Sequence, residues 1–235
     1  MVKRDFRVVA EKSKLVEIAQ KLVDSFSQRD KLFKHYTDVP EYKIPQNVEL
    51  GSREHAFFIM LSVGFDARER SEIVYDAGKR LVQDHNVDVL AKLKYEDLRK
   101  IVVRYIPENV SVHSRTVFDI FKLLSDFQND PRLLFDGIRD YDSARRKLTQ
   151  IYGYGNGKSS LLIKNFLRFG YLEFDNRFDC SPKIDTHMIK MSVGMQAIRF
   201  VDNRSGSFLE ERLNPGQTIG IRIDGIRNLL ETGYR

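Results

Sequence analysis

The feature that most constrains this fold is a glycine-rich reversal at residues 151–157, which lies between two stretches of helical periodicity. Residues 142–148 have the pattern of a helix before the reversal, and residues 159–169 have that of an apolar helix after it. Glycine can take positive φ without strain, so the backbone can turn sharply between them. The sequence therefore predicts two helices joined by a tight hairpin. Its three alternating glycines are Gly153, Gly155 and Gly157.

A hairpin of this kind directs several backbone N–H groups outward at the start of its second helix, and such an arrangement binds phosphate. Lys158 would lie in the first turn of that helix. There the positive end of the helix dipole disfavours an ammonium group and favours a neutral, nucleophilic amine. A lysine beside a phosphate-binding turn is a candidate for attack on a sugar carbon.

A second candidate group, Asp185, follows Lys158 by 27 positions and begins a predicted helix over residues 185–193. Taken singly, Lys158 is also consistent with a solvated lysine, although the start of a helix is an unfavourable site for a cation, and Asp185 with an ordinary helix N-cap. Together with the glycine hairpin before them and Thr186-His187 after them, the two residues favour a catalytic pair.

These segments resemble the signature of the helix-hairpin-helix DNA glycosylase superfamily (HhH-GPD). In that family a hairpin of the Leu-Pro-Gly-Val-Gly type leads into a lysine, and a later segment of the Val-Asp-Thr-His type supplies an aspartate. The matching residues here are Ile151-Tyr152-Gly153-Tyr154-Gly155, Lys158 and Lys183-Ile184-Asp185-Thr186-His187. Aligned on the lysine, the hairpin is one residue longer than the common pattern. Aligned on the glycines, the lysine position falls on Gly157 instead.

The resemblance implies an all-α fold with two helical subdomains flanking a DNA-binding cleft. One subdomain would combine residues 1–65 with residues 185–235, and the other would be a helical barrel over residues 66–184 that contains the helix-hairpin-helix. It further implies a monomeric, bifunctional DNA glycosylase/AP lyase of base excision repair, acting on double-stranded DNA without a cofactor. The chain is most similar to the archaeal 8-oxoguanine enzymes of this superfamily, so the expected substrate is 8-oxoguanine.

Each predicted site residue takes its role from the same resemblance. Lys158 would displace the base at C1′ and form a Schiff base, and Asp185 would stabilise the positive charge that develops on the sugar. The damaged nucleotide would be flipped out of the duplex into the cleft. The residues expected to contact DNA are Gly153, Gly155, Asn156, Gly157, Phe65, Arg68 and His187.

Phe65 has two interpretations. Residues 56–61 are so apolar that their helix must be buried, and Ser52 is a suitable N-cap for it. Phe65 stands at the break after this helix, where the resembling family carries residues that enter the DNA base stack. Equally, Phe65 closes the core at the end of the helix.

Two other functions are weighed against the lyase. A non-catalytic protein could use the same hairpin for contacts with the DNA backbone, and a glycosylase of this type could act on oxidised pyrimidines. A nucleotide-binding P-loop is disfavoured, although Gly157-Lys158-Ser159 ends like a Walker A motif. Tyr152 stands where that motif needs glycine, and the segment before it is helical where a P-loop requires a buried strand.

Composition limits the partners and the chemistry. The net charge of +6 and the isoelectric point near 9.3 favour an anionic partner such as nucleic acid. The single cysteine, Cys180, excludes a disulfide framework and a four-cysteine iron–sulfur cluster. The five histidines lack paired ligand spacing, so we expect no catalytic metal. No apolar run has signal-peptide or membrane-spanning length, so we expect an intracellular, soluble protein associated with chromosomal DNA.

The remaining periodicity predicts further helices and very little strand. The helices are expected over residues 8–26, 69–84, 87–93, 95–105, 112–127 and 226–232, and one weak strand over residues 218–223.

Overall fold

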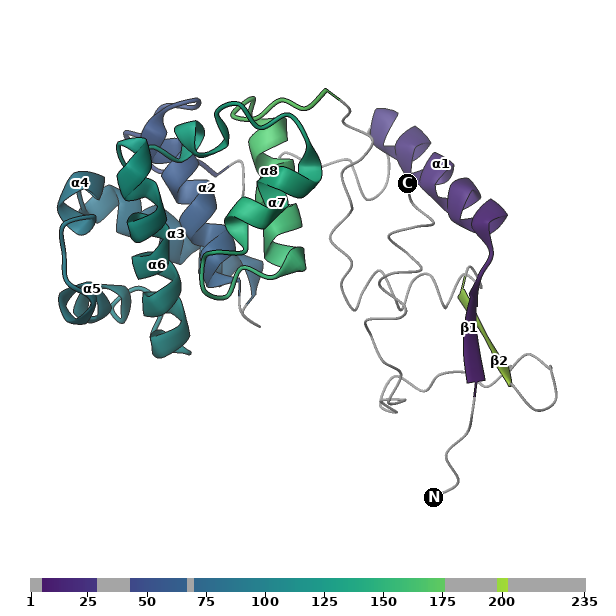
Figure 1. Cartoon of the computed structure of the whole chain (residues 1–235), viewed down its shortest axis with the longest axis horizontal. Helices are drawn as coiled ribbons and strands as arrows, with labels where there is room; N and C mark the ends of the chain where they lie inside the picture. The colour runs from purple at the N-terminus through teal and green to yellow at the C-terminus, as the bar shows by residue number, and fades with distance from the viewer. Residues whose placement is uncertain (1–5, 29–42, 67–69, 176–197, 203–235) are drawn as a thin grey trace, which may run out of the picture. The chain divides into compact units, whose positions relative to one another are not determined.

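The structure, a computed structural model, describes residues 6–28, 43–66, 70–175 and 198–202 (Figure 1). The chain divides into two compact units, Met1–Tyr36 with Ile184–Arg235 and Thr37–Lys183. Several predictions fall outside the described residues: the elements over residues 185–193, 218–223 and 226–232, and the site residues Arg68, Asp185 and His187.

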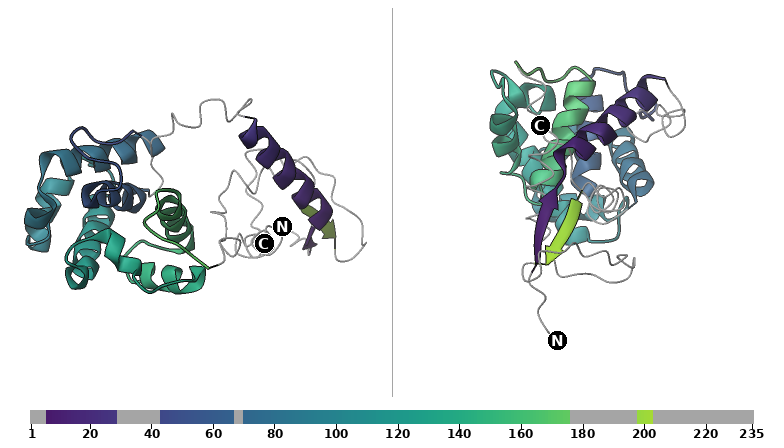
Figure 2. Two further views of the ribbon diagram at one scale, coloured as in Figure 1. Left: turned by 90° about the horizontal axis from the view of Figure 1, so that it is seen from above. Right: turned by 90° about the vertical axis from the view of Figure 1, so that its right-hand side faces the viewer.

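In the first unit, strand β1 (Phe6–Ala10) precedes helix α1 (Lys12–Ser27) and pairs antiparallel with β2 (Ile198–Asp202). Phe6 lies opposite Asp202, and Ala10 lies opposite Ile198; the two strands run side by side in Figures 1 and 2. The sequence predicted a helix from residue 8, which is wrong for residues 8–10. The described residues are mostly helical, as expected, and the strands among them are limited to this two-stranded sheet.

The second unit is built around helix α2 (Arg53–Phe65), which is buried from His55 to Phe65. The helix begins as predicted, because the Ser52 side chain accepts a hydrogen bond from the His55 N–H at 3.1 Å. The described helices after it are α3 (Ser71–Asp84), α4 (Val87–Leu90), α5 (Tyr95–Val102), α6 (Val110–Leu124), α7 (Tyr141–Leu148) and α8 (Asn156–Arg168), with 3₁₀ helices η4 (Ser125–Phe127) and η5 (Pro131–Phe135) between α6 and α7.

The position of α2 differs from the predicted domain boundary. The predicted boundary follows residue 65, whereas α2 packs against α3, α6, α8 and η5 within the unit Thr37–Lys183 (Figure 1). A helix that is apolar on every side has to lie in the middle of a core. Its neighbours must therefore surround it, and a boundary at its C-terminal end would have exposed one of its faces.

Two glycines let neighbouring helices approach α2 closely. A Cβ atom on Gly78 of α3 would lie 2.2 Å from the Ser62 Oγ, and one on Gly64 of α2 would lie 3.1 Å from the Thr116 Cγ2 of α6. The C-terminal end of α2 is thereby held against α6, and this contact positions the site described next. Within the described part of the chain, no helix combines the length and the apolar character needed to cross a membrane.

Candidate nucleic-acid interface at the α7–α8 turn

Helices α7 and α8 are joined by a tight turn, residues 149–155, called here the α7–α8 turn. The Tyr154 N–H donates to the Ile151 carbonyl at 3.0 Å, and Gly153 between them has φ of +79°. Gly155 has φ of −82° and ψ of −175°, which any residue adopts. Positive φ is thus required at Gly153 alone, and the expectation that the other glycines serve the turn in the same way is not supported.

The start of α8 is open to an approaching ligand. Gly155 is the N-cap of α8 and makes no side-chain cap hydrogen bond, and a Cβ atom on Gly155 or Gly157 would meet no atom within 4 Å. The first N–H groups of a helix have no acceptor within it, and they carry the positive end of the helix dipole. An anion that reached this surface could accept hydrogen bonds from the backbone.

A guanidinium lies beside the same turn. Arg145 of α7 donates to the Asn156 Oδ1 at 3.1 Å, so its guanidinium reaches the first residue of α8, while a second contact joins it to Asp142 at 3.4 Å. Arg145 was not among the predicted site residues, although local charge could have indicated it, because residues 143–172 contain no acidic residue. The basic residues of that segment are Arg145, Arg146, Lys147, Lys158, Lys164 and Arg168.

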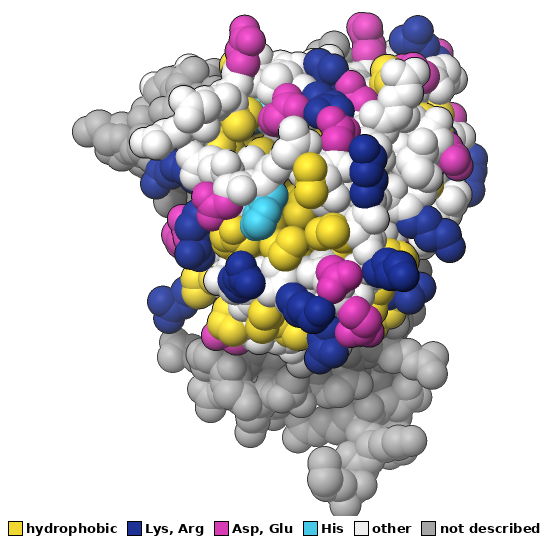
Figure 3. All heavy atoms as spheres, turned by 90° about the vertical axis from the view of Figure 1, so that its left-hand side faces the viewer, with side chains coloured by type: hydrophobic (Ala, Val, Ile, Leu, Met, Phe, Trp, Pro, Cys, Tyr) yellow, Lys and Arg dark blue, Asp and Glu magenta, His cyan; other side chains and the backbone are white. Residues whose placement is uncertain are grey.

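Surface charge is distributed differently on the side of the unit that carries α4 and α5. There, hydrophobic side chains gather near the middle of the face, and basic and acidic side chains are interspersed around them (Figure 3). Val89 of α4 and Val103, just after α5, are among the exposed hydrophobic residues of the chain. Of these two surfaces, the α7–α8 turn is the one suited to an anion.

Lys158 is the third residue of α8, and its side chain is only partly exposed. Its Nζ donates a hydrogen bond to the Gly64 carbonyl oxygen at 2.6 Å, and a Cβ atom on Gly153 would lie 3.9 Å from the same Nζ. Gly64 is in the last turn of α2, where helix carbonyls carry partial negative charge. This charge favours an ammonium group and opposes the effect of the α8 N-terminus, which was expected to favour a neutral amine.

His113 of α6 lies close to this lysine and was missed by the sequence analysis. Its ring packs edge-to-face on Phe65, with centroids 5.5 Å apart and an interplanar angle of 89°. Burial, and secondarily the positive charge of Lys158, lowers the pKa of His113 to about 4. Neither ring nitrogen has a hydrogen-bond partner among the described residues. A neutral, buried imidazole therefore adjoins the end of α2.

Phe65 itself is fully buried in the core of the second unit. Its contact with His113 agrees with the interpretation that it closes the core at the end of α2. The alternative role, insertion into a DNA base stack, stays a prediction. The turn is tied to the same helix by Tyr154, whose buried hydroxyl donates to the Met60 carbonyl at 2.6 Å.

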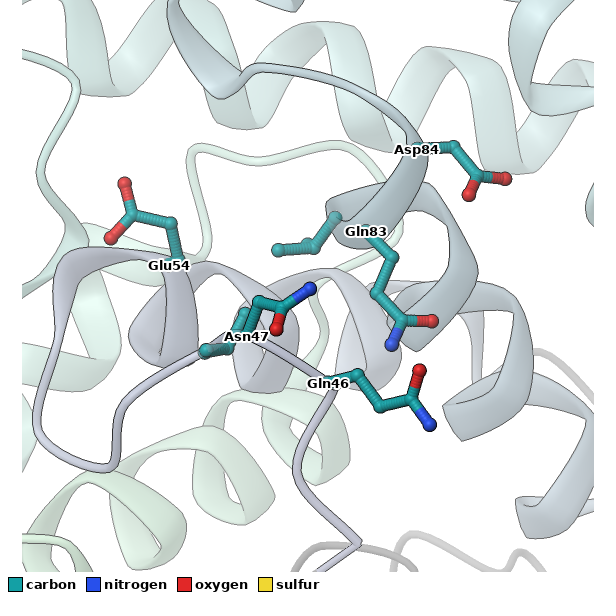
Figure 4. A pocket seen from close by; sticks show the side chains of 7 residues that line it. Gln46, Asn47, Glu54, Gln83 and Asp84 are labelled. Carbon is teal, nitrogen blue, oxygen red and sulfur yellow. The ribbon is translucent and has the colours of Figure 1, made fainter.

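A separate pocket of about 340 Å³ lies near the other end of α2 (Figure 4). Glu54, in the first turn of α2, lines it, whereas Gly64 is ten residues further along, roughly 15 Å at the rise of an α-helix. None of the lining residues has a buried polar atom without a hydrogen-bond partner. The pocket is therefore distinct from the Lys158 site. Its lining residues are Gln46, Asn47, Val48, Glu54, Val82, Gln83 and Asp84.

The structure brings together Lys158, Gly153 and the end of α2, and it places Gly155, Asn156 and Gly157 at the open start of α8. Asp185, His187 and Arg68 lie outside the described residues, so the pairing of Lys158 with Asp185 stays a prediction. No protein-family model matches the chain, and the search of curated proteins finds no match.

Proposed function

We propose that this protein is a DNA glycosylase with AP lyase activity that removes an oxidised base from duplex DNA. The observation that carries the proposal is the position of Lys158, in the first turn of a helix that begins at two exposed residues, Gly155 and Asn156. Phosphate bound at those N–H groups would bring a sugar of the same strand within reach of the lysine. The charge of Arg145 at the first residue of α8 supports phosphate binding at this place.

The proposed reaction begins when the neutral Lys158 amine attacks C1′. The new N–C1′ bond forms as the glycosidic bond breaks, and the base leaves with its bonding electron pair and takes up a proton. The sugar ring then opens to give a Schiff base between Nζ and C1′. Loss of a proton from C2′ expels the 3′ phosphate by β-elimination, and water hydrolyses the Schiff base to release the lysine.

Asp185 is the proposed carboxylate partner of this lysine. It would stabilise the positive charge on the sugar as the base leaves, and it would accept a proton from the attacking amine. Lys158 must first lose a proton, because the ammonium that donates to the Gly64 carbonyl has no lone pair for attack, and the neutral amine must then leave this carbonyl. Binding of DNA would have to supply that release.

A second candidate function is DNA binding without catalysis. The hydrogen bond from Lys158 to Gly64 favours it, because it gives the lysine a structural role in joining α8 to α2. In that case the turn would bind phosphates, and the Lys158 amine would keep its hydrogen bond to the Gly64 carbonyl. Both functions predict a salt-dependent affinity for duplex DNA, with log affinity falling by about 0.9 per phosphate contact for each unit of log salt.

The substrate is tested with a panel of duplexes that carry 8-oxoguanine, thymine glycol, uracil or a G·T mismatch. Each is incubated with the protein and borohydride, which reduces a Schiff base to a stable covalent link. We expect trapping on 8-oxoguanine. Trapping on thymine glycol alone would assign the enzyme to oxidised pyrimidines. Salt-dependent binding with no trapping on any lesion or on an abasic site would support the non-catalytic alternative.

A further inference from the structure

The α7–α8 turn is held by hydrogen bonds from one helical turn of α6. The Asp119 Oδ2 accepts a hydrogen bond from the Tyr152 N–H at 3.2 Å. The Thr116 Oγ1 lies 3.0 Å from the Tyr152 carbonyl oxygen and 2.9 Å from the Val112 carbonyl oxygen, so the single hydroxyl hydrogen is shared between these acceptors. The backbone N–H and the carbonyl of Tyr152 are therefore both held by side chains from outside the turn.

The same threonine also crowds the position after Tyr152. Gly153 follows directly, and a Cβ atom there would lie 3.1 Å from the Thr116 Oγ1, in addition to the strain of its positive φ. The Tyr152 side chain, in contrast, is half exposed. The interactions that hold this residue are therefore made by its backbone and not by its ring.

The negative charge of Asp119 is offset by a neighbouring arginine. Its side chain is only 14% exposed, and it pairs with Arg115 of α6 at 3.1 Å. The guanidinium offsets the negative charge of Asp119, which would otherwise repel a phosphate that approaches the turn. Asp119 thus supplies an acceptor for the Tyr152 N–H, and Arg115 limits the electrostatic cost of having a carboxylate there.

We propose that Thr116 and Asp119 are positioning residues that fix the Tyr152 peptide units, and with them the phosphate-binding conformation of the α7–α8 turn, before DNA arrives. The inference rests on the proposed function, since it concerns the same phosphate site. A turn that is already in its bound conformation loses less conformational freedom on binding, and affinity increases accordingly. Neither residue touches the reacting atoms, so the effect belongs to binding and not to the chemical step.

The test compares four variants for affinity towards a duplex with a stable abasic-site analogue, at a temperature where circular dichroism shows every variant folded. Thr116→Val removes the hydroxyl and keeps the shape, whereas Thr116→Ser keeps the hydroxyl. Asp119→Ala removes the acceptor, whereas Asp119→Asn keeps an acceptor and removes the charge. The matched control is Asp76→Ala, since Asp76 pairs with Arg80 on α3 at 2.9 Å with the same four-residue spacing.

Thr116→Val and Asp119→Ala should each weaken binding about two- to tenfold, the range for losing one hydrogen bond, with the salt slope unchanged. Thr116→Ser should bind like the wild type, and Asp119→Asn at least as tightly. Equal affinity of Thr116→Val and the wild type for DNA would overturn the inference. Tighter binding by Asp119→Ala would also overturn it, because the only effect of Asp119 would then be repulsion of phosphate by its negative charge. If the wild-type protein itself fails to bind DNA, the proposed function fails and the inference with it.

Discussion

The amine of Lys158 lies 2.6 Å from the carbonyl oxygen of Gly64, so the residue expected to be a nucleophile also joins the start of α8 to the end of α2. Lys158→Gln should therefore lower the free energy of unfolding by about 1–2 kcal/mol, because a charged hydrogen bond is lost and the carbonyl is left without that donor. Urea unfolding monitored by circular dichroism measures the change. Lys122→Gln, on the exposed side of α6, is the control and should change stability by less than about 0.5 kcal/mol. Equal stability of the two variants would contradict a structural role for the amine.

Two glycines of the turn should respond differently to the same substitution. Gly153→Ala places a Cβ atom in a left-handed conformation and 3.1 Å from the Thr116 Oγ1, so it should destabilise the fold by about 1–2 kcal/mol. Gly155→Ala meets no neighbouring atom and should fold with nearly wild-type stability. Its methyl group would nevertheless project into the space where phosphate is expected, so DNA affinity should fall. Thermal unfolding and DNA titration of both variants separate the two effects, and a stable Gly153→Ala protein would show that the turn is not constrained as described.

The free energy of unfolding should also decrease as the pH is lowered, because two histidines are buried. Burial lowers the pKa of both His55 and His113 from 6.5 to about 4. Between these pH values the unfolded chain binds protons that the folded chain does not. The stability contribution is therefore complete above pH 6.5 and is lost as the pH falls towards 4, by at most about 1.4 kcal/mol per pH unit for each histidine.

His113→Leu tests this account, because it removes one of the two titrating groups. From pH 6.5 to 4.5 the variant should lose about 2–3 kcal/mol less stability than the wild type does. Urea unfolding at several pH values gives the two profiles. Parallel profiles would mean that His113 is protonated in the folded protein, contrary to its burial beside Lys158.

Much of the second unit could be predicted from local patterns. The apolar run and the Ser52 cap identified α2 as a buried helix, and the periodicity identified α7 and α8 on either side of the turn. These features depend on residues that are close together in the chain, so they can be identified from a single sequence. The position of Lys158 in the first turn of α8 followed from the same local pattern.

The errors concern contacts between distant segments. Residues 8–10 of strand β1 were assigned to a helix because the partner strand, Ile198–Asp202, is nearly two hundred residues away and no local pattern shows that pairing. For the same reason the sequence did not show that Lys158 contacts Gly64, or that Thr116 and Asp119 hold Tyr152. From the sequence, Lys158 was expected at the positive N-terminal end of α8. Only the fold shows that its amine also contacts the negative C-terminal end of α2.

The most direct test of the central claim is borohydride trapping on a duplex that contains an abasic site, a substrate that needs no base release. The wild-type protein and Lys164→Gln, a substitution further along α8, should both become covalently linked to the DNA. Lys158→Gln should bind the same duplex, at a temperature where it is folded, and form no covalent complex. Undiminished trapping by Lys158→Gln would contradict the assignment of Lys158 as the nucleophile.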